Sequence, residues 1–260
     1  MNRLAKLRDF VSGVLLVFLC ALAWEVLSQA GALDQYYFPP VTKIFSALWE
    51  MTLQGDLWIN LRSSVYRMFA GFLIAASISL PLGILMGASP FSRNLFGMAV
   101  EFLRPIPSVA IIPIIILLVG VGDSMNITSI AYASTWPLLI NTIEGISSVE
   151  TLFVSSARSF QVSSTRIMFT VMLPSALPQI LSGMRISFAM ALALTVLSEM
   201  VVSTHGLGHS ILDAQNTLDT PAMYAGILVV ALLGLLINVG FNWMADLAFP
   251  WIERYRGVEI

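Results

Sequence analysis

Three side chains in the last quarter of the chain have the types and spacing of a metal site. His205, His209 and Asp213 recur every four residues, which would align imidazole and carboxylate ligands on one face of a helix. Gly206 and Gly208 interrupt that stretch, and each glycine weakens a helix by about 1 kcal/mol. No glutamate follows His205 as in zinc proteases. We therefore expect no metal here and interpret the segment as a turn that leads into a helix.

A second chemistry, ATP hydrolysis at a phosphate-binding loop, is excluded by the lysines. The chain has only Lys6 and Lys43, and neither follows a glycine, whereas such a loop ends in Gly-Lys-Ser/Thr. The single Cys20 rules out an intrachain disulfide framework. An intramembrane enzyme would need a nucleophile–base or metal pair at depth, and both histidines are expected outside the bilayer. The sequence predicts no catalytic residue and no cofactor in this chain.

The composition is that of a membrane protein. The chain is 57% hydrophobic and 11% charged, whereas soluble domains carry about 25% charged residues. A net charge of -2 gives no indication of nucleic-acid binding. Because apolar segments recur along the whole length, we expect a single membrane domain spanning residues 1–260. Residues 1–60 would hold one span and an outer amphipathic segment, and residues 61–250 a core of five spans.

Six segments are apolar and long enough to cross a bilayer, which takes about 20 residues of helix. The third and fourth are separated only by residues 122–124 and would form a tight hairpin. The uncharged stretch Ile167–Met184 is long enough for another span, but Pro174 and Pro178 disfavour one. We interpret it as a short interfacial helix that ends at Leu173, followed by a turn. The expected spans are Phe10–Leu27, Ser63–Met86, Pro107–Val121, Met125–Ile143, Ile180–Val202 and Met223–Leu247.

The N-terminal apolar run has two readings. Basic residues precede it, as in a signal peptide, but no small-residue cleavage site follows Leu27, and Trp24 and Glu25 occupy the place of one. We expect a retained membrane anchor.

Basic residues predict the orientation, because loops on the cytoplasmic side are enriched in lysine and arginine. With both termini in the cytoplasm, the outer segments hold only Lys43 and Arg62, together with the amphipathic stretch Val41–Gln54. The inner segments then hold Arg3, Lys6, Arg8, Arg93, Arg158, Arg166, Arg254 and Arg256.

Charged side chains within the spans lie near the span ends, where snorkelling or pairing inside the protein is expected. They are Arg67, Glu101, Arg104, Arg185 and Glu199. The span centres carry neutral polar residues that would either line a pathway or bond their own helix backbones. These are Ser77, Ser79, Thr128, Ser134, Thr135, Asn141 and Thr195.

A polar segment, Ser155–Pro178, interrupts the apolar pattern on the expected cytoplasmic side. Val149, Leu152, Phe153, Ser156 and Phe160 recur at helical spacing and form a mostly apolar stripe. Ser163 or Ser164 has the type of a helix cap before a second short helix. Two short helices joined by a turn are therefore expected. They would either dock a partner or rest on lipid.

This segment resembles the EAA loop of inner-membrane permeases from binding-protein-dependent ABC importers. Ala157 matches the second alanine of that pattern, and Leu173-Pro174 matches its Leu-Pro pair. Further matches indicate the nitrate/sulfonate/taurine/bicarbonate branch. They are Ala23–Glu25, Leu80–Gly87, Leu103–Pro113, Ala176–Pro178, Ser182–Ala189, Ser198–Met200 and Gly206–Asn216.

The resemblance implies an all-α fold of the type I ABC importer permease (MetI-like) class, with six transmembrane helices and both termini in the cytoplasm. It also implies a multi-pass protein of the bacterial inner membrane, surrounded by lipid. The partners would be a cytoplasmic ATPase dimer that holds ATP and Mg²⁺, a second permease copy (identical or different), and a periplasmic or lipoprotein substrate-binding protein. The cargo would be a small organic or inorganic anion.

By the same resemblance, the loop over residues 145–178 couples the ATPase to the membrane helices. Ser155, Ser156 and Gln161 replace the family's Glu, first Ala and Gly. Either Gln161 adopts a left-handed conformation, at roughly 1 kcal/mol, or the turn has another shape. The expected coupling residues are Leu152, Phe153, Ser155, Ser156, Ala157, Arg158, Phe160, Gln161 and Pro174.

The third to fifth spans would form the translocation path. Its expected residues are Pro105, Pro107, Thr135, Asn141, Thr195, Ser198 and Glu199. The alternative is an ion-coupled secondary transporter, which would carry acids at mid-depth and internally repeated, broken helices. The span centres lack acids.

Overall fold

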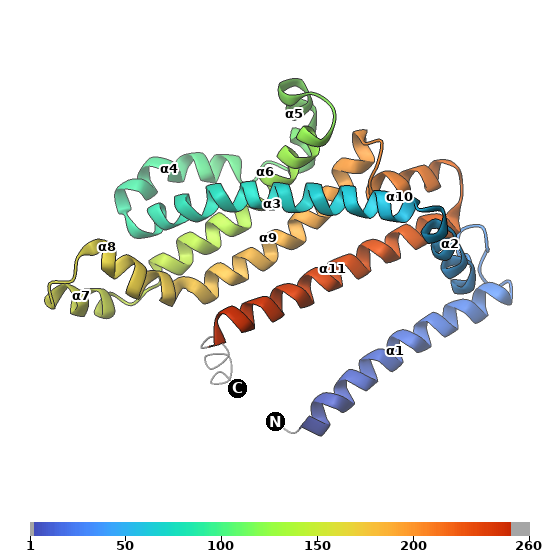
Figure 1. Cartoon of the computed structure of the whole chain (residues 1–260), viewed down its shortest axis with the longest axis horizontal. Coiled ribbons are helices and arrows are strands. Elements are labelled where there is room, and N and C mark those ends of the chain that lie inside the picture. Colours follow the sequence, from blue (N-terminus) through green and yellow to red (C-terminus); the bar gives the residue numbers. More distant parts are fainter. Residues whose placement is uncertain (1–2, 251–260) are drawn as a thin grey trace.

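The computed structural model describes residues 3–250, and over that range the chain is helical with no strand. Long helices lie side by side, with the short helices α7 and α8 at one end of the molecule and α2 and α10 at the other (Figure 1). The helices are α1 (Arg3–Gln29), α2 (Val41–Gln54), α3 (Asp56–Ala88), α4 (Pro90–Leu103), the 3₁₀ turn η1 (Ser108–Ile111), α5 (Ile112–Val119), α6 (Asp123–Ser147), α7 (Thr151–Ser159), α8 (Ser164–Ile167), the π-helical η2 (Met168–Met172), α9 (Leu173–Val202), α10 (Leu207–Asn216) and α11 (Thr220–Ala248).

Helix α6 is the centre of the molecule, packed along α3 on one side and α9 on the other. The contact with α3 is close because small residues recur every fourth position along the facing stripe. A Cβ added at Gly83 would lie 2.6 Å from the Cβ of Thr142, a clash that the native glycine avoids. Small residues of this kind allow membrane helices to approach closely. The stripe consists of Gly71, Ala75, Ser79, Gly83 and Gly87.

Helix length and composition identify only some of the six expected spans. Three helices are long and apolar enough to cross a membrane: α3, the continuous Ser164–Val202 segment and α11. A fourth candidate is the pair formed by Pro90–Leu103 and Ser108–Val119, which meet at 87°. Helix α6 is not among them. It is also the helix enclosed by α3 and α9, so its polar side chains Asn126, Ser129, Ser134 and Thr142 are buried by protein.

The expected single span Pro107–Val121 is wrong. Pro107 precedes the short turn η1, and α5 has only 8 residues, which corresponds to about 12 Å of helix. The preceding stretch, which was assigned to none of the expected spans, is the 14-residue helix α4. Pro105 and Pro107 lie at the break because each ring removes a backbone donor.

The expected turn after Leu173 is also wrong. Helix α9 begins at Leu173 with Pro174 in its first turn, and it continues through Pro178. The preceding residues 168–172 form a π-helical turn, whose hydrogen bonds skip one residue more than those of an α-helix. Such a widened turn accommodates a residue that lacks an N–H. The second short helix expected after residue 163 therefore continues into one long helical segment.

Helix α1 joins the rest of the chain mainly at its C-terminal end. The Glu25 carboxylate accepts hydrogen bonds from the Thr42 backbone N–H (3.1 Å) and hydroxyl (2.8 Å), and so caps the start of α2. The Trp24 ring lies edge-on to that of Tyr224 on α11, with ring centroids 5.4 Å apart. Helix α2 has the bounds predicted for the amphipathic stretch.

Candidate functional site

Helix α7 presents large apolar side chains to solvent. Leu152, Phe153 and Phe160 are 66%, 52% and 83% exposed. Ala157, at the edge of this stripe, is half-buried where α7 packs against α8 and η2. The stripe predicted from sequence is therefore a two-faced helix, with one apolar face left open. Open apolar patches of this kind mark interaction sites.

The turn after α7 has the left-handed form that glycine prefers, although the residue is Gln161. Its φ is +56°, and its N–H donates to the Arg158 carbonyl at 2.8 Å. The next N–H, of Val162, donates to the Ala157 carbonyl at 3.2 Å. This pair of bonds is a Schellman motif, which closes the end of a helix. The first of the two sequence-based alternatives is confirmed: Gln161 adopts the strained conformation.

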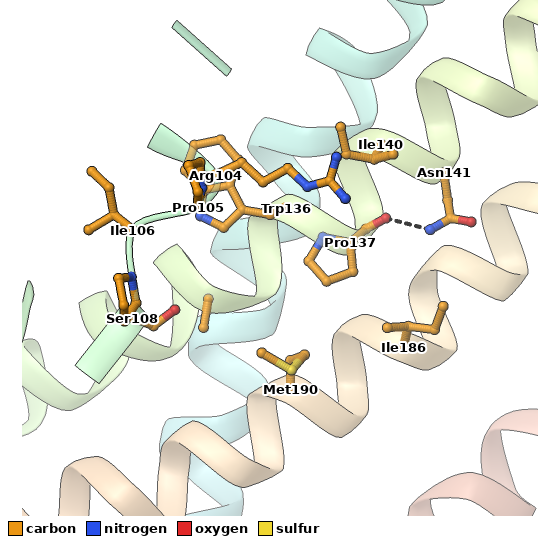
Figure 2. Close-up of a pocket in the computed structure, with 12 residues that line it drawn as sticks. Arg104, Pro105, Ile106, Ser108, Trp136, Pro137, Ile140, Asn141, Ile186 and Met190 are labelled. Atoms are coloured by element: carbon orange, nitrogen blue, oxygen red, sulfur yellow. Dashed lines mark hydrogen bonds between the residues drawn. The ribbon is translucent and has the colours of Figure 1, made fainter. Parts of the chain in front are cut away.

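A cavity of about 500 Å³ lies at the break between α4 and α5, and we call it the central hollow. Pro105 and Pro107 line it from the break, while Trp136 and Asn141 line it from the middle of α6. In Figure 2, Arg104 extends from the break over α6, and Met190 faces it from α9. Its walls are mostly apolar with a few polar groups, as in small-molecule sites. The remaining lining residues are Ile106, Ser108, Ala133, Pro137, Ile140 and Ile186.

Asn141 is held firmly in this wall. Its Nδ2 donates to the Pro137 carbonyl at 2.8 Å, and its Oδ1 accepts from Gln179 Nε2 at 2.9 Å. A Cβ at Gly183 would lie 2.5 Å from the Asn141 Cβ, so glycine there makes room for the side chain. One N–H of the Asn141 amide is left over after these bonds, because the amide has two.

The outer pathway candidate Glu199 lies in a buried ionic cluster at the α10 end. Glu199 has no exposed surface, and its carboxylate pairs with Arg67 at 2.9 Å. It also accepts hydrogen bonds from the Ser64 hydroxyl (2.8 Å) and the Gly208 N–H (3.0 Å). The pairing inside the protein that we expected for Arg67 and Glu199 is therefore present.

The same cluster sets the turn before α10. Arg67 donates to the His205 carbonyl at 2.6 Å and pairs with Asp123 at 2.7 Å. Gly206 has φ +126°, and a Cβ there would lie 2.3 Å from Glu199 Cδ. The expected turn leading into a helix at His205 is confirmed. Within residues 3–250, no three His, Cys, Asp or Glu side chains are placed to hold a metal ion.

The remaining polar candidates bond their own helices. Thr135 and Thr195 donate to carbonyls one turn earlier, both at 2.8 Å, and Ser198 donates to the Thr195 carbonyl at 3.2 Å. Thr195 and Ser198 have no exposed surface in this chain. Of the expected pathway residues, Pro105, Pro107 and Asn141 share the central hollow.

Residues 79–254 match the family of binding-protein-dependent transport system inner membrane components. That range contains α4 to α11, and with them the central hollow and α7. The chain belongs to this family. It is therefore a permease of the ABC importer type and a component of the inner membrane.

Similar permeases align with this chain over nearly its whole length. The aliphatic sulfonates transport permease protein SsuC of Bacillus subtilis (strain 168) is 31% identical over 97% of this chain and 91% of its own length. The taurine transport system permease protein TauC of Escherichia coli (strain K12) is 28% identical, over 88% of this chain and 85% of its own. The bicarbonate transport system permease protein CmpB of Synechocystis has the same identity and coverage, 28%, 88% and 85%.

The fold agrees with a solved permease. The inward-facing MetNI methionine ABC transporter superposes on 75% of this chain and 94% of its own with a TM-score of 0.63, at 18% identity. The helical, MetI-like fold expected from sequence is thus confirmed.

Sequence reasoning overlooked two parts of the permease. Arg104 was grouped with the charges expected to snorkel or pair, although it lines the central hollow. Its position next to Pro105 and Pro107, which were predicted pathway residues, could have indicated this. Ser64 was not considered, because a hydroxyl near a span end carries no distinguishing pattern, and only the fold brings it to Glu199.

Proposed function

We propose that this permease carries a small organic or inorganic anion inward, powered by a separate ATPase dimer that binds ATP and Mg²⁺. The relatives named for aliphatic sulfonates, taurine and bicarbonate all handle small oxyanions or zwitterions, and this supports a cargo of that size and charge. The cargo would arrive on a periplasmic or lipoprotein binding protein. The family assignment does not favour an ion-coupled secondary transporter.

The observation that carries the coupling proposal is the open apolar face of α7. Leu152, Phe153 and Phe160 would insert into a groove of the ATPase. The Schellman motif at Gln161 fixes the angle between α7 and the long Ser164–Val202 segment, so a displacement of α7 would be passed to that segment. Ser155, Ser156, Arg158 and Pro174 border this face or lie along the connection.

We further propose six membrane crossings per permease, with two permease copies per transporter and residues 1–60 as a peripheral first unit. The crossings would be α1, α3, the α4–α5 pair, α6, the Ser164–Val202 segment and α11. Both termini would be cytoplasmic. In support, Arg93, Arg158 and the ends of α3 and α6 line one common hollow beside α7. The basic residues Arg254 and Arg256, which entered the orientation argument, lie outside the described residues.

Co-purification with the ATPase tests the coupling proposal. Phe153→Asp places a charge in the open face, and we expect the ATPase recovered with the permease to fall about tenfold or more, as for a buried aromatic anchor. Ala157→Asp is a less clean change, because Ala157 is half-buried within the permease itself. Ser159→Asp adds the same charge to an exposed position off the stripe and serves as the matched control. Equal recovery from the Phe153 variant and the control would contradict the docking assignment.

A further inference from the structure

We propose that the central hollow binds a short-chain organic sulfonate, with Arg104 as the cation that holds its head group. The inference rests on the proposed anion cargo and adds a site within the permease itself.

The charge in the hollow is of one sign. Arg104 is the only charged residue that lines it, and its guanidinium has no ion-pair partner among residues 3–250. Arg67, by contrast, is paired with both Asp123 and Glu199. Glu101, three residues earlier, lines the neighbouring hollow but makes no ion pair with Arg104, and unpaired arginines of membrane proteins mark ligand or ion pathways. Arginine is also the side chain whose fork of donors matches planar or tetrahedral oxyanions.

The backbone at Arg104 is held in place by the elements around it. Arg104 directly follows α4, and Pro105 and Pro107 constrain the backbone where the α4 and α5 axes turn by 87°. The Tyr132 hydroxyl of α6 donates to the Leu103 carbonyl at 2.7 Å and ties the end of α4 to α6. The Asn141 amide, held by Pro137 and Gln179, supplies a spare N–H in the same wall.

The wall of the hollow opposite Arg104 is apolar and would favour a ligand that carries an alkyl chain. Ile186 and Met190 of α9 line the hollow across from Arg104 (Figure 2), and they add no donor or acceptor beyond the weak methionine sulfur. An alkyl chain would contact them while the sulfonate meets Arg104. A volume of about 500 Å³ is within the usual range for a small-molecule site. Hydrogencarbonate, which has no alkyl chain, would leave this wall unfilled.

The arginines continue beyond the central hollow towards α7. Arg104 also lines a second hollow with Arg93, and Arg93 lines a third with Arg158. Glu101 is the only acid that lines any of the three. A series of weak cationic sites allows an anion to enter and to leave, which transport requires.

Fluorine NMR of the full chain, assembled with its ATPase in nanodiscs, tests the site. The chain has 6 tryptophans, so 5-fluorotryptophan labelling gives few signals, and Trp136→Phe assigns the one in the hollow. We expect ethanesulfonate at constant ionic strength to shift the Trp136 signal saturably, and hydrogencarbonate to shift it with lower affinity. Arg104→Gln should weaken ethanesulfonate about tenfold or more, as for loss of a charged hydrogen-bond partner. Arg104→Lys should lie in between.

The control is Arg62→Gln, which removes a charge from an exposed position on α3 and should leave the titration unchanged. If Arg104→Gln does not assemble, Met190→Phe narrows the hollow without altering its charge and should also weaken ethanesulfonate. An unmoved Trp136 signal, or equal affinity in these variants, overturns the proposal. ATPase stimulation by the binding protein is measured on the same particles. Stimulation with no shift rejects the site alone, whereas absent stimulation rejects the proposed function.

Discussion

At the scale of single residues, Gln161 carries a conformation that its side chain disfavours. A left-handed backbone costs a non-glycine residue roughly 1–2 kcal/mol, and a β-branched one more. We expect Gln161→Gly to stabilise the turn by up to about 1 kcal/mol and Gln161→Val to destabilise it by a similar amount. Trypsin cleavage at Arg158 and Arg166, on either side of the turn, should slow in the first variant and accelerate in the second. The same rate in both would show that the turn is not left-handed in solution.

The Arg67–Glu199 pair is a second residue-scale case, in which removing one partner leaves the other charge buried. We expect Arg67→Met to cost about 3–5 kcal/mol of stability, because Glu199 has no exposed surface. The double variant Arg67→Met, Glu199→Met should recover much of that loss. Asp123→Asn, at a partner whose side chain is 57% exposed, should cost less than about 1 kcal/mol. Thermal unfolding of the detergent-purified permease measures the stability of all three variants. If the double variant loses the sum of the two single losses, the pairing is contradicted.

At the scale of elements, the α3–α6 contact depends on the small-residue stripe. Gly83→Leu should prevent close packing, since even a Cβ at that position meets Thr142 at 2.6 Å. We expect loss of folded protein, because membrane helices associate through such close contacts. Gly240→Leu on α11, where a Cβ meets nothing within 4 Å, is the matched control. Yields of monodisperse protein, measured by size-exclusion chromatography, compare the two variants. Equal yields would rule out the stripe as the basis of the contact.

The elements also show where sequence reasoning succeeds and where it fails. Helix α2 was predicted with its bounds because its apolar periodicity is local and Pro39-Pro40 precedes it. Helix α4 was assigned to no span because Arg93 and Glu101 interrupt its apolar residues. Yet Ser89, whose side chain accepts from the Ser92 N–H, followed by Pro90 is a readable helix start. At Pro174 the sequence predicted a helix end where the helix in fact continues. The π-helical turn before it makes this possible, and no local sequence pattern predicts such a turn.

At the scale of the whole molecule, the central hollow is a tertiary feature that no single segment encodes. Its lining comes from the break after α4, from α6 and from α9, and those segments meet only because α6 packs between α3 and α9. The sequence could predict Pro105, Pro107 and Asn141 as candidates, because prolines and mid-span amides are conspicuous. It could not show that Thr195 and Ser198 are buried, since burial depends on which helices cover them.

The orientation of the whole molecule is testable with single cysteines. The α7 end and the α10 end lie at opposite ends of the long helices (Figure 1), so they should face opposite sides of the membrane. In a Cys20→Ser background, Asn216→Cys should react with a membrane-impermeant maleimide in spheroplasts, and Ser163→Cys should react only after lysis. Both positions are exposed within the chain, so a difference in labelling reports the side of the membrane rather than burial. Because the enriched arginines lie at the α7 end, that end should be cytoplasmic. Labelling of the Ser163 variant from outside would invert the orientation and place the open face of α7 away from any cytoplasmic ATPase.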